Sequence, residues 1–176
     1  MGIRRAAMFA LLAAVLLVPA SGQARSRGPV ARVSSLQAAL AAQVNAFRAA
    51  HGLTRLRVST ALSAAAAAHS TQMARVGYFS HNSANGTPFS RRIVTYYPAR
   101  GYRSWTAGEN LLWASPDVGA ARALKLWLAS APHRANLLSP RWREIGLSAV
   151  HSTSAPGVYR NAPATIVTAD FGARSR

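Results

Sequence analysis

The sequence has no cysteine among its 176 residues. This absence excludes disulfide bonds, thiolate nucleophiles, thiolate zinc sites and a lipidated cysteine behind a signal sequence. Acidic residues are scarce as well, with four Asp and Glu against 21 Lys and Arg. Any chemistry that needs a carboxylate must therefore use one of these four acids, which are Glu109, Asp117, Glu144 and Asp170.

The shortage of acids leaves a formal net charge of +17, and all the cations except Lys125 are arginines. Two explanations stay open. A genome-wide preference for arginine and alanine codons would produce this composition without any function. Alternatively, the charge serves an anionic partner, such as an anionic lipid, lipopolysaccharide, a cell-wall glycan or nucleic acid. Nucleic acid is the least favoured of these partners because the N-terminus is typical of an exported protein.

Long hydrophobic runs are also absent, apart from residues 6–18 near the N-terminus. That run is too short to span a bilayer comfortably, which takes roughly 20 apolar residues. Because two arginines precede it and small residues follow it, we predict a signal peptide over residues 1–20. Cleavage after Ala24 and an uncleaved anchor are the alternatives. Cleavage after Ala20 would send the protein to the periplasm or the medium and lower its net charge from +17 to +15, since Arg4 and Arg5 are removed.

The remaining chain predicts one α+β domain. Residues 21–33 are basic and contain Gly and Pro, which is typical of a flexible lead-in to a domain at 34–176. Apolar spacing and end signals predict helical segments over about 34–51, 61–76, 117–130 and 132–138, and a further short helix that begins at Pro88 and fades near Pro98. The segments 78–87 and 102–116 are expected to be loops, and 145–150 and 165–171 to be strands. Helices early and strands late favour a single domain with a small antiparallel sheet.

Four short strings stand out from residue 77 onward. They are GYFSHNS (77–83), GYRSWTAGENLLWA (101–114), LWLASAPHRANLLSPRWREIGLSAV (126–150) and VTADFG (167–172). Their order and spacing resemble the bacterial branch of the CAP superfamily, which groups cysteine-rich secretory proteins, antigen 5 and pathogenesis-related proteins. The segment 44–81 also resembles the first helices of the family. The resemblance covers residues 34–172.

The resemblance implies a CAP-type three-layer α-β-α sandwich with an open cleft. In many members two histidines and two acids line that cleft. His81, Glu109 and His133 match three of these positions. Ser130 stands where animal and plant members often have the second glutamate, which puts in doubt any activity that needs two carboxylates.

Two imidazoles and one carboxylate are a competent ligand set for a divalent ion such as zinc. A metal at His81, Glu109 and His133 is accordingly a tentative prediction, which rests on the resemblance because the chain has no short metal-binding motif. The alternative is a metal-free, hydrogen-bonded cluster that fixes the surrounding loops. We interpret His69 as a packing or hydrogen-bonded residue, and Glu144 as a structural partner for arginine.

Three functions follow from these residues. The leading hypothesis is a non-enzymatic binding or interaction module of the cell envelope or extracellular medium, which needs no cofactor. The alternative is a metal-assisted hydrolase acting on envelope or secreted substrates, with Glu109 as general base. The third is a structural or signalling domain whose cleft is vestigial.

Overall fold

A computed structural model describes residues 28–176, and their centre is a sheet of three long antiparallel strands. The long strands are β3 (Ser104–Ala114), β4 (Glu144–Ala155) and β5 (Ala162–Ser175). Two short strands, β1 (Val30–Arg32) and β2 (Arg57–Val58), pair with β4, the first antiparallel and the second parallel. The sheet order is β1-β4-β5-β3, so β3 forms an edge of the sheet.

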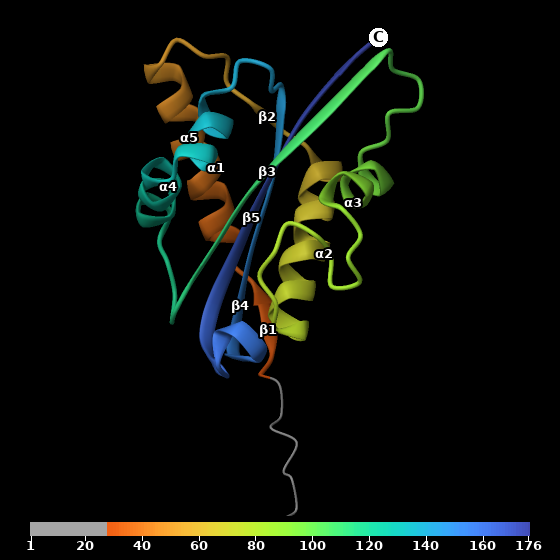
Figure 1. Ribbon diagram of the computed structural model, residues 1–176. Coiled ribbons are helices and arrows are strands. Elements are labelled where there is room, and N and C mark those ends of the chain that lie inside the picture. The colour runs from red at the N-terminus through yellow and green to blue at the C-terminus, as the bar shows by residue number, and fades with distance from the viewer. Residues whose placement is uncertain (1–27) are drawn as a thin grey trace, which may run out of the picture.

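Helices cover both faces of this sheet, which confirms the predicted α+β class and the three-layer sandwich (Figure 1). Helices α2 (Thr60–Val76) and α3 (Phe89–Tyr96) lie on one face. The other face carries α1 (Ser34–Ala50), α4 (Ala120–Ala129) and α5 (Ala131–Leu138). A short 3-10 helix, η1 (Gly157–Tyr159), lies in the connection between β4 and β5.

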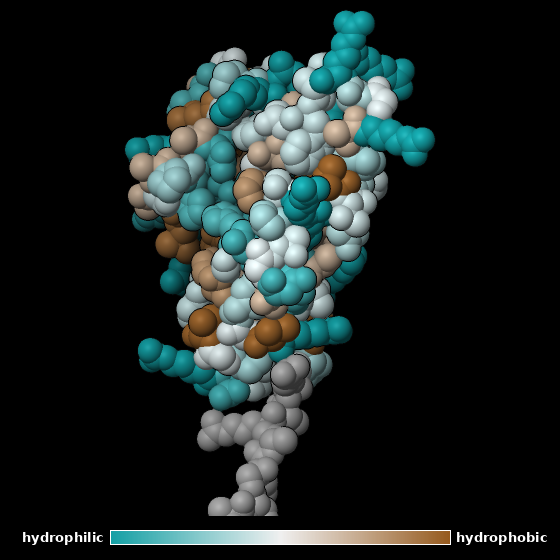
Figure 2. Space-filling view, turned by 45° about the vertical axis from the view of Figure 1, so that its right-hand side comes forward, coloured by the Kyte–Doolittle hydropathy of each residue, from teal (hydrophilic) through white to brown (hydrophobic). Residues whose placement is uncertain are grey.

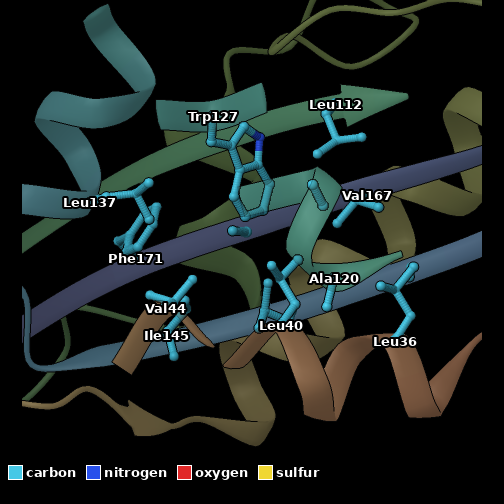
Figure 3. Packing of buried hydrophobic residues seen from close by; sticks show 14 of the residues in the cluster. Leu36, Leu40, Val44, Leu112, Ala120, Trp127, Leu137, Ile145, Val167 and Phe171 are labelled. Atoms are coloured by element: carbon cyan, nitrogen blue, oxygen red, sulfur yellow. The ribbon is translucent and has the colours of Figure 1, made fainter. Parts of the chain in front are cut away.

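The layer of α1, α4 and α5 packs on the sheet through the largest apolar cluster (Figure 3). Leu36, Leu40 and Val44 recur every four residues along α1 and form the buried stripe that the sequence predicts. Trp127 of α4 is completely buried among them, and its indole N–H donates to the Leu111 carbonyl at 3.1 Å. Burial of this apolar surface anchors α4 to strand β3.

Small residues let α2 lie very close to the opposite face. Ala65 and Ala66 are fully buried there, and a Cβ at Gly146 of β4 would come within 2.1 Å of the Leu62 backbone. The helix has the predicted ends, because the Ser59 hydroxyl accepts from the Leu62 N–H and Gly77 closes it in the left-handed conformation.

Strand β3, which carries Glu109, occupies most of a segment that the sequence predicts to be a loop. The predicted loop was 102–116, so this prediction is wrong. The sequence does not look like a strand here because Glu109 and Asn110 interrupt the alternation of apolar residues. Both are nevertheless buried, since each forms hydrogen bonds with polar partners. Likewise α4 begins at Ala120, three residues beyond the predicted start at Asp117, which is exposed.

The predicted lead-in at 21–33 also changes, because Val30–Arg32 forms β1 and pairs with Ser152, His151 and Val150. The ordered domain therefore begins before residue 34. The predicted signal peptide at 1–20 and the start of the lead-in lie outside the described residues. Within residues 28–176, no helix is both long and apolar enough to cross a bilayer.

Candidate functional site

A cleft of about 350 Å³ lies across edge strand β3 and takes residues from both helical layers. The strand contributes its floor from Thr106 to Glu109, and the remaining walls come from the segment before α3, from α3 and from the region of α5. The lining residues are His81, Phe89, Thr106, Ala107, Gly108, Glu109, Asn136, Arg141 and Trp142. A volume near the lower end of ordinary ligand pockets suits a small ligand or one end of a larger one.

Glu109 is the buried acid of this cleft. Its side chain is 1% exposed, whereas that of His81 is 51% exposed. The His81 Nδ1–H donates to Glu109 Oε1 at 2.8 Å, and the Arg92 guanidinium forms an ion pair with Oε2. Arg92 also donates to the His81 carbonyl at 3.1 Å. Both carboxylate oxygens are therefore engaged, and Arg92 fixes His81 and Glu109 together.

Arg92 was missed by the sequence reasoning, although a signal was present. Phe89, Ile93 and Tyr97 recur every four residues and turn one side of α3 toward α2 and the sheet. Arg92 follows Phe89 by three residues, so it shares that inward side. An arginine on the apolar side of a short helix indicates a buried anionic partner, because a buried charge must be paired.

Asp170 is the second buried acid near the cleft. It lies directly opposite Glu109 in the β3–β5 register and is fully buried. Within the described chain, neither of its carboxyl oxygens has a hydrogen-bond partner. Burial, followed by the neighbouring charge of Glu109, raises the pKa of Asp170 well above its usual value. Asp170 lies behind Glu109 and does not line the cleft, so the missing acid at Ser130 is not replaced by a second carboxylate facing the ligand.

His69 supports the cleft from α2 and is completely buried. Its Nε2–H donates to the Ser80 carbonyl at 2.8 Å, which holds the residue next to His81. Burial first, and the charge of Arg92 second, lower the pKa of His69 to about 4. The structure thus confirms the interpretation of His69 as a hydrogen-bonded packing residue.

His133 lies on α5, on the other side of β3. Its backbone carbonyl accepts from Asn110 Nδ2 at 3.0 Å, and Asn136 Nδ2 bonds both the Glu109 carbonyl and Asn110 Oδ1. Burial, followed by the charge of His81, lowers the pKa of His133. The structure therefore brings His81 and Glu109 into direct contact, and holds the His133 segment on the strand without a hydrogen bond from its ring to Glu109.

The remaining acid of the ordered core, Glu144, has the structural role that the sequence predicts. Arg57 pairs with its Oε1 at 2.5 Å, and the Tyr97 hydroxyl donates to Oε2. Because burial and the adjacent carboxylate raise the pKa of Tyr97, that hydroxyl keeps its proton. Glu144 is thus committed to joining β2, β4 and α3.

The suitability of the cleft for a metal depends on Glu109. Among residues 28–176, no three His, Asp or Glu side chains are grouped so that they could hold a metal ion. The reason is local, since the oxygens of Glu109 already face His81 and the positive charge of Arg92. In this arrangement the residues do not fit a zinc centre, and the zinc site at His81, Glu109 and His133 stays a prediction.

The α-β-α sandwich and the His–Glu contact at an edge strand together define a CAP-type domain. Residues 41–171 match the family described as "CAP: Cysteine-rich secretory protein family". The match spans most of the sequence, and the chain belongs to this family.

Bacterial relatives agree with this assignment. The uncharacterized protein YkwD of Bacillus subtilis (strain 168) is 33% identical over 123 residues, which cover 69% of this chain and 45% of that protein. A crystallised extracellular protein containing a SCP domain from Bacillus anthracis is 26% identical with a TM-score of 0.61, covering 81% of this chain and 41% of the other. The chain therefore spans less than half the length of these two relatives.

A further structure is similar over its whole length. An outer surface protein of Borrelia burgdorferi has a TM-score of 0.68, covering 84% of this chain and 99% of the other. At 20% identity this likeness shows the fold alone.

Proposed function

We propose that this CAP-domain protein is an exported binding module that holds an anionic envelope ligand in the cleft across β3, without altering that ligand chemically. The observation that carries the proposal is the double engagement of Glu109. A general base needs a carboxylate oxygen free to accept a proton from the attacking water. Here His81 occupies one oxygen of Glu109 and Arg92 the other, so the carboxylate acts as a brace between two segments.

The cleft lining favours a polar ligand with negative charge. Thr106 and the half-exposed ring of His81 offer hydrogen-bonding groups, and the exposed Arg141 adds a full positive charge. The Arg141 guanidinium lies 5.7 Å from the centre of the Trp142 ring, which orients it at the cleft. An acidic saccharide or a lipopolysaccharide headgroup has the matching chemistry, since arginine binds carboxylate and phosphate through two parallel hydrogen bonds.

Two independent features support export. The first 20 residues have the composition of a signal peptide. Relatives that share the fold are described as extracellular or as outer surface proteins. We propose the periplasm or the extracellular medium as the place where the cleft meets its ligand.

Isothermal titration calorimetry with solubilised lipopolysaccharide and with acidic cell-wall glycan fragments tests the proposal. We expect one of these probes to bind the wild type, and Arg141→Gln to weaken that binding about tenfold, as loss of one charge-assisted contact would. The matched control is Arg122→Gln, which removes the same charge from an exposed position of α4 outside the cleft and should bind as the wild type does.

The same samples distinguish binding from hydrolysis. Mass spectrometry of the probe after prolonged incubation should return it unchanged. Cleavage of the probe that Glu109→Gln abolishes would overturn the proposal in favour of the metal-assisted hydrolase. Absence of binding to every probe would overturn it as well.

A further inference from the structure

Exposed arginines gather at one end of the sheet, the end where β3 and β4 begin and β5 finishes (upper end in Figure 1). Hydrophilic side chains project from the same end in Figure 2. We define the arginine end by six exposed residues of the described chain, which are Arg55, Arg57, Arg100, Arg103, Arg143 and Arg176. It is separate from the cleft, because none of the six lines that cavity.

Backbone hydrogen bonds show that these arginines form a row. The Arg57 N–H donates to the Arg143 carbonyl at 3.0 Å, and the Arg143 N–H donates to the Gly172 carbonyl at 3.0 Å. At the far side of β5, the Arg103 N–H donates to the Ser175 carbonyl at 2.9 Å. Arg57 and Arg143 therefore lie on neighbouring strands, which are about 4.8 Å apart. The β5 partners of Arg143 and Arg103 are three residues apart, so the row is staggered along the strands.

Tyrosines and Arg174 hold the backbone under one half of this row. The Arg174 guanidinium carbon lies 3.7 Å from the Tyr97 ring centre and 4.5 Å from that of Tyr102. The Arg174 Nη1–H donates to the Pro98 carbonyl at 3.2 Å. These contacts fasten the segment 97–103 to β5, so Arg100 and Arg103 project from an anchored backbone.

Little negative charge offsets the row. In the described part of the chain, Glu144 is the acid at this end, and Arg57 together with Tyr97 already occupies its oxygens. Like charges placed side by side cost stability unless a counter-ion is present. The row is therefore an unbalanced positive surface that steps across the strand ends.

We propose that the arginine end docks a linear polyphosphate, a polymer in which every repeating unit is a phosphate group. Arginine suits phosphate because its planar fork donates two hydrogen bonds to one group. The row of arginines suits a polymer, whereas insertion into a membrane requires a broad apolar surface between the charges. Only Val58 and Tyr96, of the large hydrophobic side chains exposed on residues 28–176, belong to segments at this end.

Binding of inorganic polyphosphate of defined length tests the proposal, measured by calorimetry in low salt and again in high salt. The test variant is Arg100→Gln/Arg103→Gln/Arg176→Gln, which replaces three exposed arginines of this end. The matched control is Arg32→Gln/Arg75→Gln/Arg122→Gln, which removes three exposed arginines from β1, α2 and α4. Both variants have the same net charge, and both leave Arg141 and the cleft intact.

We expect the test variant to bind polyphosphate between about tenfold and about 100-fold more weakly, and the control less than about threefold more weakly. Wild-type affinity should fall steeply as salt rises, because counter-ions released from the polymer drive such contacts. Equal losses in the two variants would overturn the proposal, since net charge alone would then explain binding. Tighter binding to anionic phospholipid vesicles, or to DNA, than to polyphosphate would also overturn it.

Polyphosphate binding at the arginine end can be tested separately from ligand binding in the cleft. Arg141→Gln should leave polyphosphate binding unchanged, and the triple variant at the arginine end should leave binding of the cleft ligand unchanged. Failure of one proposal therefore does not resemble failure of the other.

Discussion

The two faces of the sheet differ although the same strands form both. Toward α1, α4 and α5, the strands present Leu112, Val167 and Phe171 to an apolar cluster around Trp127. Toward α2 and α3, the neighbouring residues include Glu109 and Asp170, which are buried beside Arg92 and His69. Apolar burial stabilises the fold, whereas buried charges cost free energy unless each has a partner. Smaller apolar clusters also stabilise the second face. The comparison indicates that the second face differs because it additionally buries the charges that position the cleft.

The largest effect is expected from Trp127→Ala on the apolar face. The change removes a fully buried ring and its hydrogen bond to Leu111, and should lower the free energy of unfolding by about 3–5 kcal/mol. Urea unfolding measures the loss. Trp113→Ala is the control, because that ring is 37% exposed and should cost far less. Equal losses in the free energy of unfolding for Trp127→Ala and Trp113→Ala would contradict the stabilising role of the apolar cluster.

Arg92→Met should cost nearly as much on the polar face, about 3 kcal/mol. It keeps the volume of the side chain but leaves Glu109 buried without its ion-pair partner. The double variant Arg92→Met/Glu109→Gln should recover part of the loss, since no unpaired charge then remains. A double variant less stable than Arg92→Met alone would show that the buried pair does not behave as described.

The pH dependence of stability should reveal His69. Its folded pKa of about 4 lies below the usual value of 6.5, so the unfolded chain binds the proton more readily. The contribution of His69 is therefore complete above pH 6.5 and is lost as pH falls toward 4, by up to about 3 kcal/mol. His69→Gln should flatten the unfolding free energy between pH 7 and 4. An unchanged slope in that variant would contradict the prediction.

Asp170→Asn should change stability less than the preceding variants do, and should raise it at high pH. A raised folded pKa means that the stability linked to Asp170 is complete below its unfolded pKa and is lost as pH rises through the folded value. Asparagine keeps the shape of the neutral acid and cannot ionise, so the variant should melt at a higher temperature than the wild type at pH 8, with the difference shrinking toward pH 4. Calorimetric melting curves measure this, and a lower Tm at pH 8 would contradict it.

Local features on both faces of the sheet could be predicted from the sequence. The stripe of Leu36, Leu40 and Val44 and the ends of α2 depend on local spacing and on single end residues such as Ser59 and Gly77. These signals are local, and they were confirmed.

The polar face was harder to predict because its partners come from distant segments. Strand β3 was expected to be a loop, since Glu109 and Asn110 interrupt its apolar pattern. Their partners, Arg92 and Asn136, lie 17 and 26 residues away in the sequence. The family resemblance located His81 and Glu109 in one cleft, but only the fold shows that Arg92 joins them.

The central claim is that Arg92 and His81 hold the carboxylate of Glu109, so that Glu109 is not available to a metal or a substrate. Calorimetric titration with zinc at neutral pH, of the wild type and of Glu109→Gln, tests this claim most directly. We expect the wild type and Glu109→Gln to give the same zinc titration curve. One-to-one zinc binding by the wild type that disappears in Glu109→Gln would contradict it.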